Sequence, residues 1–378
     1  MQIVIQRDYL AQAVGQVSKA VSSRTTIPIL TGIKVAATSE EVIFTGSDAD
    51  ISIQASVPVE VEGKEIVKVV KLGTIVLPSK YVTEIVKKLP EPLVEIEVQD
   101  NNVTLIRSGS AEFNLNGLNA DEYPKLPQID DEKLLSLSSD LFKSMIRQTS
   151  FAVSTQESRP ILTGVLWNLE QSELSFVATD SHRVALRKVH VDATEELEIK
   201  NVVIPAKSLN ELNRILHDED EVIEIVVSDN QILVKADHIL FYSRLLEGTY
   251  PDTSRIIPQS SKSQVTVETK QLLQAIERAS LLAKDMKHVV KLSTIAGDRI
   301  QISSNTPEVG KVVEHIHAQE ISGEEVQISF NSRYMIEALK AIDHPEIQIG
   351  FTGAMSPFII RPTENDRILH LVLPVRTY

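Results

Sequence analysis

The chain has 378 residues, an apolar content of 42% and a charged content of 24%, which is typical of a globular protein. Its formal charge of −14 argues against a protein that is basic throughout, and no apolar run reaches membrane-spanning length. The sequence contains no cysteine, which excludes disulfides and thiolate metal sites, and residues 1–7 lack the pattern of a signal peptide. We therefore expect a cytoplasmic protein that does not contact membranes.

Three successive stretches of the chain predict the same order of elements: strand, helix, strands, helix, strands. The first helix of each stretch is expected to begin near Arg7, Ser139 and Thr269. Apolar positions 141, 142, 145 and 146 follow helical spacing, and residues 41–45 and 173–177 alternate as strands do. The sum is an α+β chain with six helices and many antiparallel strands.

A long internal repeat links the first two stretches. The pentapeptide Pro-Ile-Leu-Thr-Gly occurs at Pro28–Gly32 and again at Pro160–Gly164, 132 residues later. At the same offset, Phe44 and Asp48 recur as Phe176 and Asp180. A shared offset over a long stretch indicates one ancestral unit used more than once, and repeated units commonly build symmetric assemblies.

A second segment recurs three times, at residues 77–89, 204–216 and 330–342. Each copy has Lys or Arg at its fourth place and Glu at its eighth, and Pro78 and Pro205 suit helix starts. The dipeptide Tyr-Pro closes the first two copies at residues 123–124 and 250–251. The sequence therefore predicts three domains, at residues 1–127, 128–258 and 259–378, each of ordinary domain size.

The charges divide between the predicted helices and the rest of the chain. The helices contain fourteen basic and six acidic residues, a net charge of +8 within a chain of −14, so the remainder carries −22. A basic helical face would attract phosphates on one side only. The alternative is that Lys and Arg simply favour helices while Glu occupies solvated strand ends.

Motifs for catalysis are almost absent. The chain has no glycine-rich phosphate loop, no dinucleotide fingerprint and no HExxH, and we expect neither a cofactor nor a metal. Asp180, Ser181 and His182 supply the residue types of a catalytic triad. Because adjacent residues in an extended chain point in different directions, they cannot form that geometry locally, and a turn or binding role is favoured.

These features together resemble the bacterial DNA polymerase III beta subunits, the sliding clamps, and in particular their Firmicutes-like members. The resemblance covers the whole chain and depends on the three-fold repeat, Thr179–Arg183, Leu246–Asp252 and Leu371–Arg376. It implies three domains of the DNA clamp fold, each with two helices and antiparallel sheets. Two chains would join head to tail as a homodimer, forming a pseudo-six-fold ring around duplex DNA.

The resemblance also implies where partners bind. Through short linear motifs, the polymerase III alpha subunit, the clamp loader, other polymerases and repair proteins would enter one pocket between the second and third domains. The implied pocket residues are Leu162, Thr179, Ser181, His182, Arg183, Val184, Pro251, Ile256, Val372, Leu373, Pro374, Val375 and Arg376. Such a set has mostly apolar walls with a few polar groups to orient a peptide.

Two further sets follow from the resemblance. Sequence-independent contacts with double-stranded DNA are implied for Arg24, Lys80, Gln156, Lys207 and Arg255. The dimer interface is implied at Phe113 and Leu115 from the first domain against Leu281 and Leu282 from the third. Two other functions stay open on the residues alone: a peptide scaffold that does not bind DNA, and a hydrolase that uses Ser181 and His182.

Overall fold

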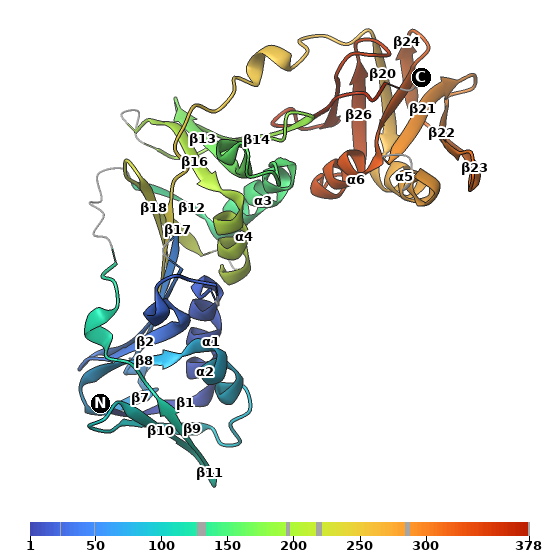
Figure 1. Ribbon diagram of the computed structural model, residues 1–378. Coiled ribbons are helices and arrows are strands. Elements are labelled where there is room, and N and C mark those ends of the chain that lie inside the picture. Colours follow the sequence, from blue (N-terminus) through green and yellow to red (C-terminus); the bar gives the residue numbers. More distant parts are fainter. Residues whose placement is uncertain are drawn as a thin grey trace. The chain divides into compact units, whose positions relative to one another are not determined.

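The computed structural model describes residues 1–376 except 23, 49, 127–133, 194–196, 217–220 and 284–287. The chain packs into two compact units (Figure 1), one of residues 1–140 with 211–245 and the other of residues 141–210 with 246–378. Among the described residues, no helix is long and apolar enough to cross a membrane.

The described residues form six α-helices, as the sequence predicts. They are α1 (Arg7–Val17), α2 (Ser79–Val86), α3 (Ser139–Thr149), α4 (Ala206–Ile215), α5 (Thr269–Ala283) and α6 (Ser332–Ala341). Helices α1 and α2 pack side by side in the first unit, and α5 and α6 do so in the second (Figure 1). The first helix of each repeat begins where the sequence places it, at residues 7, 139 and 269.

The second helices are shorter than the repeated segments. Pro78 and Pro205 close strands, and α2 and α4 begin at the next residue. Lys19 lies in a 3₁₀ turn, Lys87 and Lys88 follow the end of α2, and residue 284 lies outside the described residues. The prediction of +8 on the helices was therefore too high, because the six α-helices hold ten basic and six acidic residues, a net charge of +4.

The described residues of the first unit form three antiparallel sheets. The five-stranded sheet has the order β11 (Ala111–Asn116), β10 (Val103–Ser108), β9 (Leu93–Val98), β1 (Gln2–Gln6) and β7 (Val67–Lys71). The eight-stranded sheet has the order β12 (Leu134–Ser138), β17 (Val222–Val227), β18 (Gln231–Ala236), β19 (Ile239–Arg244), β4 (Ile51–Pro58), β3 (Glu41–Ser47), β2 (Gly32–Ala37) and β8 (Gly73–Pro78). The third sheet is a short pair, β5 (Glu60–Val61) with β6 (Lys64–Glu65).

In the second unit, the part of the chain that the structure describes forms two sheets. The nine-stranded sheet has the order β16 (Ile199–Pro205), β13 (Gly164–Glu170), β14 (Glu173–Thr179), β15 (Arg183–His190), β28 (Ile368–Val372), β27 (Phe358–Pro362), β26 (Glu346–Phe351), β20 (Ser263–Glu268) and β24 (Glu320–Gly323). The four-stranded sheet has the order β23 (Gly310–His317), β22 (Arg299–Thr306), β21 (Val289–Ile295) and β25 (Gln327–Asn331).

The two large sheets each join strands of neighbouring repeats. Strand β19 of the second repeat pairs with β4 of the first, and β28 of the third pairs with β15 of the second. Contacts therefore continue through each junction instead of stopping at a linker. The domain boundaries at 127/128 and 258/259 stay a prediction, because the central repeat contributes strands to both units.

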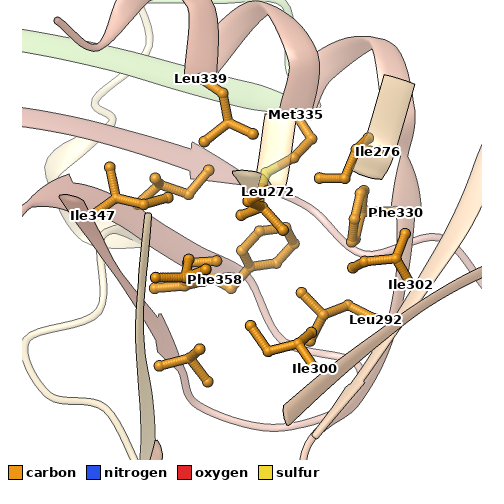
Figure 2. Close-up of a cluster of buried hydrophobic side chains, with 14 of the residues drawn as sticks. Leu272, Ile276, Leu292, Ile300, Ile302, Phe330, Met335, Leu339, Ile347 and Phe358 are labelled. Carbon is orange, nitrogen blue, oxygen red and sulfur yellow. The ribbon is translucent and has the colours of Figure 1, made fainter. Parts of the chain in front are cut away.

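The core of the third repeat lies beneath α5 and α6 (Figure 2). Leu272 and Ile276 from α5 and Met335 from α6 meet Phe330 and Phe358 from the two sheets, and all five are fully buried. The rings of the two phenylalanines have centroids 5.7 Å apart. Burying such side chains stabilises the fold by about 2–3 kcal/mol each, so the helices hold both sheets of the repeat together.

Candidate functional site

The pairing of β15 with β28 brings two segments of the predicted pocket together. Arg183 lies opposite Val372, and Val184 lies opposite Leu371. The contact continues beyond the strand, since the Leu373 backbone N–H donates to the His182 carbonyl at 2.9 Å. The turn before β15 and the C-terminal segment thus form one edge of the second unit.

The turn at Thr179–Arg183 is fixed by its own side chains. One carboxylate oxygen of Asp180 accepts hydrogen bonds from the backbone N–H groups of His182 and Arg183 at 2.9 and 3.1 Å. The Thr179 hydroxyl donates to the Arg183 carbonyl at 2.6 Å, and Ser181 adopts a φ of 75°. This local bonding is typical of Asp and Thr in turns and leaves His182 exposed.

Arg183 connects this turn to the third repeat. Its guanidinium pairs with Asp180 at 3.0 Å and with Glu337 of α6, and it donates to the Phe151 carbonyl at 2.7 Å. It also lies against the ring of Tyr334, with the guanidinium carbon 4.5 Å from the ring centroid. A side chain with these contacts is a structural support, and Arg183 is nearly buried.

A cleft with a volume of about 580 Å³ opens beside the turn. Five of its lining residues come from the predicted pocket and DNA sets, and they are Leu162, Ser181, His182, Arg183 and Gln156. Arg333, Tyr334 and Glu337 form the opposite wall from α6. The rings of His182 and Tyr334 approach edge to face, 6.3 Å between centroids.

An apolar cluster holds three members of the predicted pocket, one of which, Leu162, also lines the cleft. Leu162 and Val184 are buried in it, and Leu373 packs against it half-exposed. Tyr250 links two strands beside the cluster. Its hydroxyl accepts a hydrogen bond from the Thr179 N–H at 3.1 Å and donates one to the Gly164 carbonyl at 3.3 Å. Burial raises the pKa of Tyr250, so its phenol stays protonated as a donor.

The remaining pocket residues differ in burial and in what holds them. Val372 is buried in the core of the third repeat, and Pro251 and Ile256 are exposed. Val375 is held by its backbone N–H, which donates to the Ser329 carbonyl at 2.7 Å. Of the other two, Pro374 is half-buried and Arg376 is exposed.

Sequence reasoning missed the wall that α6 supplies. Tyr334 and Glu337 stand at the fifth and eighth places of the third repeated segment, so the repeat itself contained a signal. Phe151 has no such signal in the sequence, because its carbonyl and its ring contact the Arg183 guanidinium only after folding.

A buried histidine lies behind the same contacts. His370 of β28 is 1% exposed, and its ring faces Phe151 with centroids 5.2 Å apart. Burial lowers the pKa of His370 to about 4, against a smaller raising effect of the Gln148 and Ala338 carbonyls. The nearby Arg183 guanidinium lowers the pKa further, so the imidazole is neutral at physiological pH.

The geometry does not support nucleophilic catalysis. Both oxygens of Asp180 are directed at the backbone of its own turn and at Arg183, and no hydrogen bond joins Ser181 to the His182 ring within the described part of the chain. Across those same ranges, no group of three His, Cys, Asp or Glu side chains could hold a metal ion.

The residues implied for DNA contact are all on the surface. Arg24, Lys80, Gln156, Lys207 and Arg255 are exposed. Lys80 lies in the first turn of α2, with its ammonium 5.8 Å from the Tyr81 ring centroid. Arg255 pairs with Asp252 at 3.0 Å.

Of the residues implied for dimerisation, two lie on strand β11 of the first unit and two lie near the end of α5 in the second unit. Phe113 and Leu115 are half-buried on one face of the edge strand β11. Leu281 near the end of α5 is 64% exposed, while Leu282 is half-buried. An exposed leucine such as Leu281, or an edge strand with half-buried apolar side chains such as β11, is typical of a surface that is covered in an assembly.

The repeated fold and the cleft beside the Thr179–Arg183 turn define a class of binding proteins built from duplicated domains. Three family models match, all of the DNA polymerase III beta subunit: the N-terminal domain at residues 1–127, the central domain at 136–252 and the C-terminal domain at 254–376. The chain is 57% identical to the beta sliding clamp of Bacillus subtilis and 53% identical to that of Halalkalibacterium halodurans, with 100% of each chain covered.

Solved structures agree. The crystal structure of the Bacillus subtilis DNA polymerase sliding clamp matches with a TM-score of 0.97 at 57% identity, over 100% of both chains. A Pseudomonas aeruginosa sliding clamp bound to griselimycin matches with a TM-score of 0.93 at 25% identity, again over 100% of both chains. The chain therefore belongs to the DNA polymerase III beta subunit family, the beta sliding clamps, which confirms the resemblance. It is a non-catalytic processivity subunit with three DNA clamp domains.

Proposed function

We propose that two copies of this chain close head to tail into a ring around duplex DNA, and that the ring tethers the replicative polymerase to its template. The partners would be the polymerase III alpha subunit, the clamp loader, other polymerases and repair proteins, each through a short linear motif. The setting would be the cytoplasm. The observation that supports this proposal most strongly is the way the sheets join.

Each repeat supplies two half-sheets, and they join in one pattern. In the first, second and third repeats, one half-sheet ends in β4, β15 and β23 respectively. The other half-sheet ends in β11, β19 and β28 respectively. Within the chain β4 pairs with β19, and β15 pairs with β28. Of these six strands, only β23 and β11 have an outer edge with no neighbouring strand among the described residues. A second copy would provide each of them with the missing strand, in the same antiparallel sense.

The internal junctions also predict the register of this contact. Phe241 pairs with Ile53 at the β19–β4 junction. The equivalent positions are Phe113 on β11 and Val312 on β23, and both are half-buried on matching faces. We propose that Phe113 lies opposite Val312 of the partner subunit.

Leu281 has the position expected of a junction residue. Counted from the first helix of each repeat, it is equivalent to Lys19 and Phe151. Lys19 donates to the Arg214 carbonyl of the next repeat at 3.1 Å, and Phe151 packs against the core of the third repeat. Leu281 has no next repeat in its own chain, so a partner subunit would cover it.

Contact with DNA would be electrostatic and independent of sequence. Lys80, Arg147, Lys270 and Arg333 are exposed on four of the α-helices, and none of them forms a salt bridge among the described residues. Phosphates would be attracted to these cations and to Arg24, Lys207 and Arg255, with Gln156 as an uncharged neighbour. A net helix charge of +4 is modest, which suits a ring that must slide.

The cleft beside His182 and the apolar cluster of Leu162, Val184 and Leu373 would receive the partner motif. An extended peptide needs apolar holes and a few orienting polar groups, and both are present within a few residues of one strand pair. The ligand-bound clamp from Pseudomonas aeruginosa is in keeping with a ligand site in this family.

A crosslink across the proposed junction would test ring closure directly. The chain has no cysteine, so Phe113→Cys with Val312→Cys would be the only thiols. Opposed residues on antiparallel strands have Cα separations of about 4.5–5.5 Å, within the range of a disulfide. Oxidised protein loaded by the clamp loader should stay on circular DNA in denaturing detergent and leave when the circle is cut. Each single variant should form no crosslinked ring.

Processive synthesis by the cognate polymerase and loader on primed circular DNA would test the tether. The wild type should lengthen the products of a single binding event. A protein that bound peptides yet left product length unchanged would be a scaffold that does not act on DNA.

A further inference from the structure

A second cleft lies in the first unit, at the position equivalent to the candidate partner pocket. We call it the Lys125–Arg244 cleft, and it has a volume of about 350 Å³. Its lining residues are Ile27, Leu30, Ser47, Asp50, Ser52, Pro124, Lys125, Gln231, Tyr242, Ser243 and Arg244. By the repeat offsets, Leu30 corresponds to Leu162 and Pro124 to Pro251.

The supports of this cleft repeat those of the partner pocket. Tyr123, the counterpart of Tyr250, is buried and donates from its hydroxyl to the Thr45 carbonyl at 3.3 Å. Arg244 follows Ser243 at the end of β19, and its backbone N–H donates to the Asp50 carbonyl at 2.9 Å. The backbone frame of a peptide groove is therefore present at both junctions.

The floor of the cleft is apolar and aromatic. Leu30 is 1% exposed and Tyr242 is 9% exposed, while Ile27 projects into solvent with 42% exposed. Tyr242 packs with Leu126 and Leu233 in one small cluster. This floor can receive one or two apolar side chains.

The rim carries two cations at positions where the second junction has none. In the repeat, Lys125 corresponds to Asp252 and Arg244 corresponds to Leu373. Both cations are exposed, and neither forms a salt bridge in the described part of the chain. Asp50 is the one acidic lining residue, so the rim carries a net positive charge within a chain of −14.

We propose that the Lys125–Arg244 cleft is a second docking site, which binds an extended acidic segment of a partner protein with one or two apolar anchors. The apolar side chains would contact Leu30 and Tyr242, and the carboxylates would pair with Lys125 and Arg244. A peptide without carboxylates would bind here more weakly, because it would leave Lys125 and Arg244 without a partner. The inference depends on the proposed function only for the analogy between the two clefts.

The test uses the full chain with ¹³C-labelled leucine methyl groups, where Leu30 reports on this cleft and Leu162 on the partner pocket. The probe is an acetylated, amidated hexapeptide, Asp-Glu-Leu-Asp-Phe-Glu, and its control replaces every acid by the amide. We expect the acidic probe to shift the Leu30 methyls saturably while Leu162 stays unchanged. The amide control should bind at least about ten-fold more weakly.

The double variant Lys125→Glu with Arg244→Glu should weaken the acidic probe by at least about ten-fold. Both side chains are exposed, and unchanged Leu162 signals would show that the fold is intact. Shifts confined to Leu162, equal binding of the two peptides, or equal affinity of wild type and variant would each overturn the proposal. A clamp-binding peptide that failed to shift Leu162 would instead count against the proposed function alone.

Discussion

Arg183 of β15 lies against the face of Tyr334 of α6, with its guanidinium carbon 4.5 Å from the ring centroid. The contact joins the second repeat to the third, in the wall of the cleft that we assign to partner peptides. The same guanidinium pairs with Asp180 at 3.0 Å and donates to the Phe151 carbonyl at 2.7 Å. One nearly buried cation thus satisfies groups from three different segments.

Replacing this cation should destabilise the second unit. We expect Arg183→Met to reduce the free energy of unfolding by about 3 kcal/mol, because it leaves the Asp180 carboxylate without its buried partner. Guanidinium unfolding followed by circular dichroism would measure the change. Arg187→Met on the same strand is the matched control, since the Arg187 Nε and Nη1 atoms are buried without a partner. Equal losses in the two variants would contradict the assigned role.

A second prediction concerns His370 and acid. Burial lowers the pKa of His370 to about 4, whereas an unfolded chain has a histidine pKa of about 6.5. The stability that neutral His370 contributes is complete above pH 6.5 and is lost as the pH falls toward 4. In this range the unfolded state binds a proton at this histidine and the native state does not. The loss should approach about 3 kcal/mol, at about 1.4 kcal/mol for each pH unit.

The measurement is the difference in unfolding free energy between wild type and His370→Gln, at several pH values from 7.5 to 4.5. Taking the difference removes the titration of carboxylates that both proteins share. The unfolding free energy of the wild type should fall relative to that of the glutamine variant as the pH is lowered. A difference that stayed constant with pH would show that folding leaves the pKa of His370 unchanged.

A third prediction addresses the dimer. Truncating Leu281 and Leu282 to Ala should weaken association by about 3 kcal/mol, which is about a hundred-fold in the dissociation constant. Sedimentation at low micromolar concentration would follow the shift from dimer to monomer. Met355→Ala removes another apolar side chain that is 55% exposed and should leave the dimer unchanged. A double variant that stayed fully dimeric would move the interface elsewhere.

The repeat explains how much of this architecture the sequence could predict. Helix starts at residues 7, 139 and 269 and the equivalence of Leu30 with Leu162 follow from offsets alone. The orientation of Val372 does not follow from the offsets, because a shift of one residue in strand register decides whether a side chain faces the cleft or the core. The pairing of Phe113 with its proposed partner likewise required the observed registers of the two internal junctions.

The charge balance shows a second limit. Counting Lys87 and Lys88 as helical raised the predicted helix charge, but α2 ends at Val86. Both lysines also lie within 4 Å of Glu84, at 3.4 and 3.8 Å. Helix ends depend on local hydrogen bonds that periodicity does not resolve, so net charge per element is less predictable than the presence of the element.

A fourth prediction tests the electrostatic contact with DNA. Replacing Arg24, Lys207 and Arg255 with Glu should weaken retention on DNA and lower the dependence of affinity on salt by about 2 to 3 in log–log slope. Fluorescence anisotropy with duplexes of different sequence, from 50 to 300 mM salt, would measure both effects. The same reversal at Lys188, Lys200 and Lys235, which lie on strands, changes the net charge equally and is the control. Strong base preference in the wild type would refute a purely electrostatic contact.

The last prediction concerns the C-terminal segment as a wall of the partner site. Leu373 is held to the His182 carbonyl at 2.9 Å and Val375 to the Ser329 carbonyl at 2.7 Å, so the segment is anchored at two points. Deleting residues 375–378 removes the second anchor and the half-buried Val375 side chain. It should abolish binding of short clamp-binding peptides, because the half-exposed Leu373 would lose its fixed position beside the apolar cluster.

Isothermal titration of one clamp-binding peptide against four proteins, the wild type and three variants, would separate the contributions. His182→Ala should weaken the peptide only about five-fold, through loss of an orienting group worth about 1 kcal/mol. Arg376→Ala is the control for the deletion, since that side chain is exposed and should contribute little. The deletion should leave the dimer and retention on DNA intact, because it changes neither β11 nor β23. Equal affinities in the wild type and the deletion variant would place the partner site elsewhere and leave only the ring assignment standing.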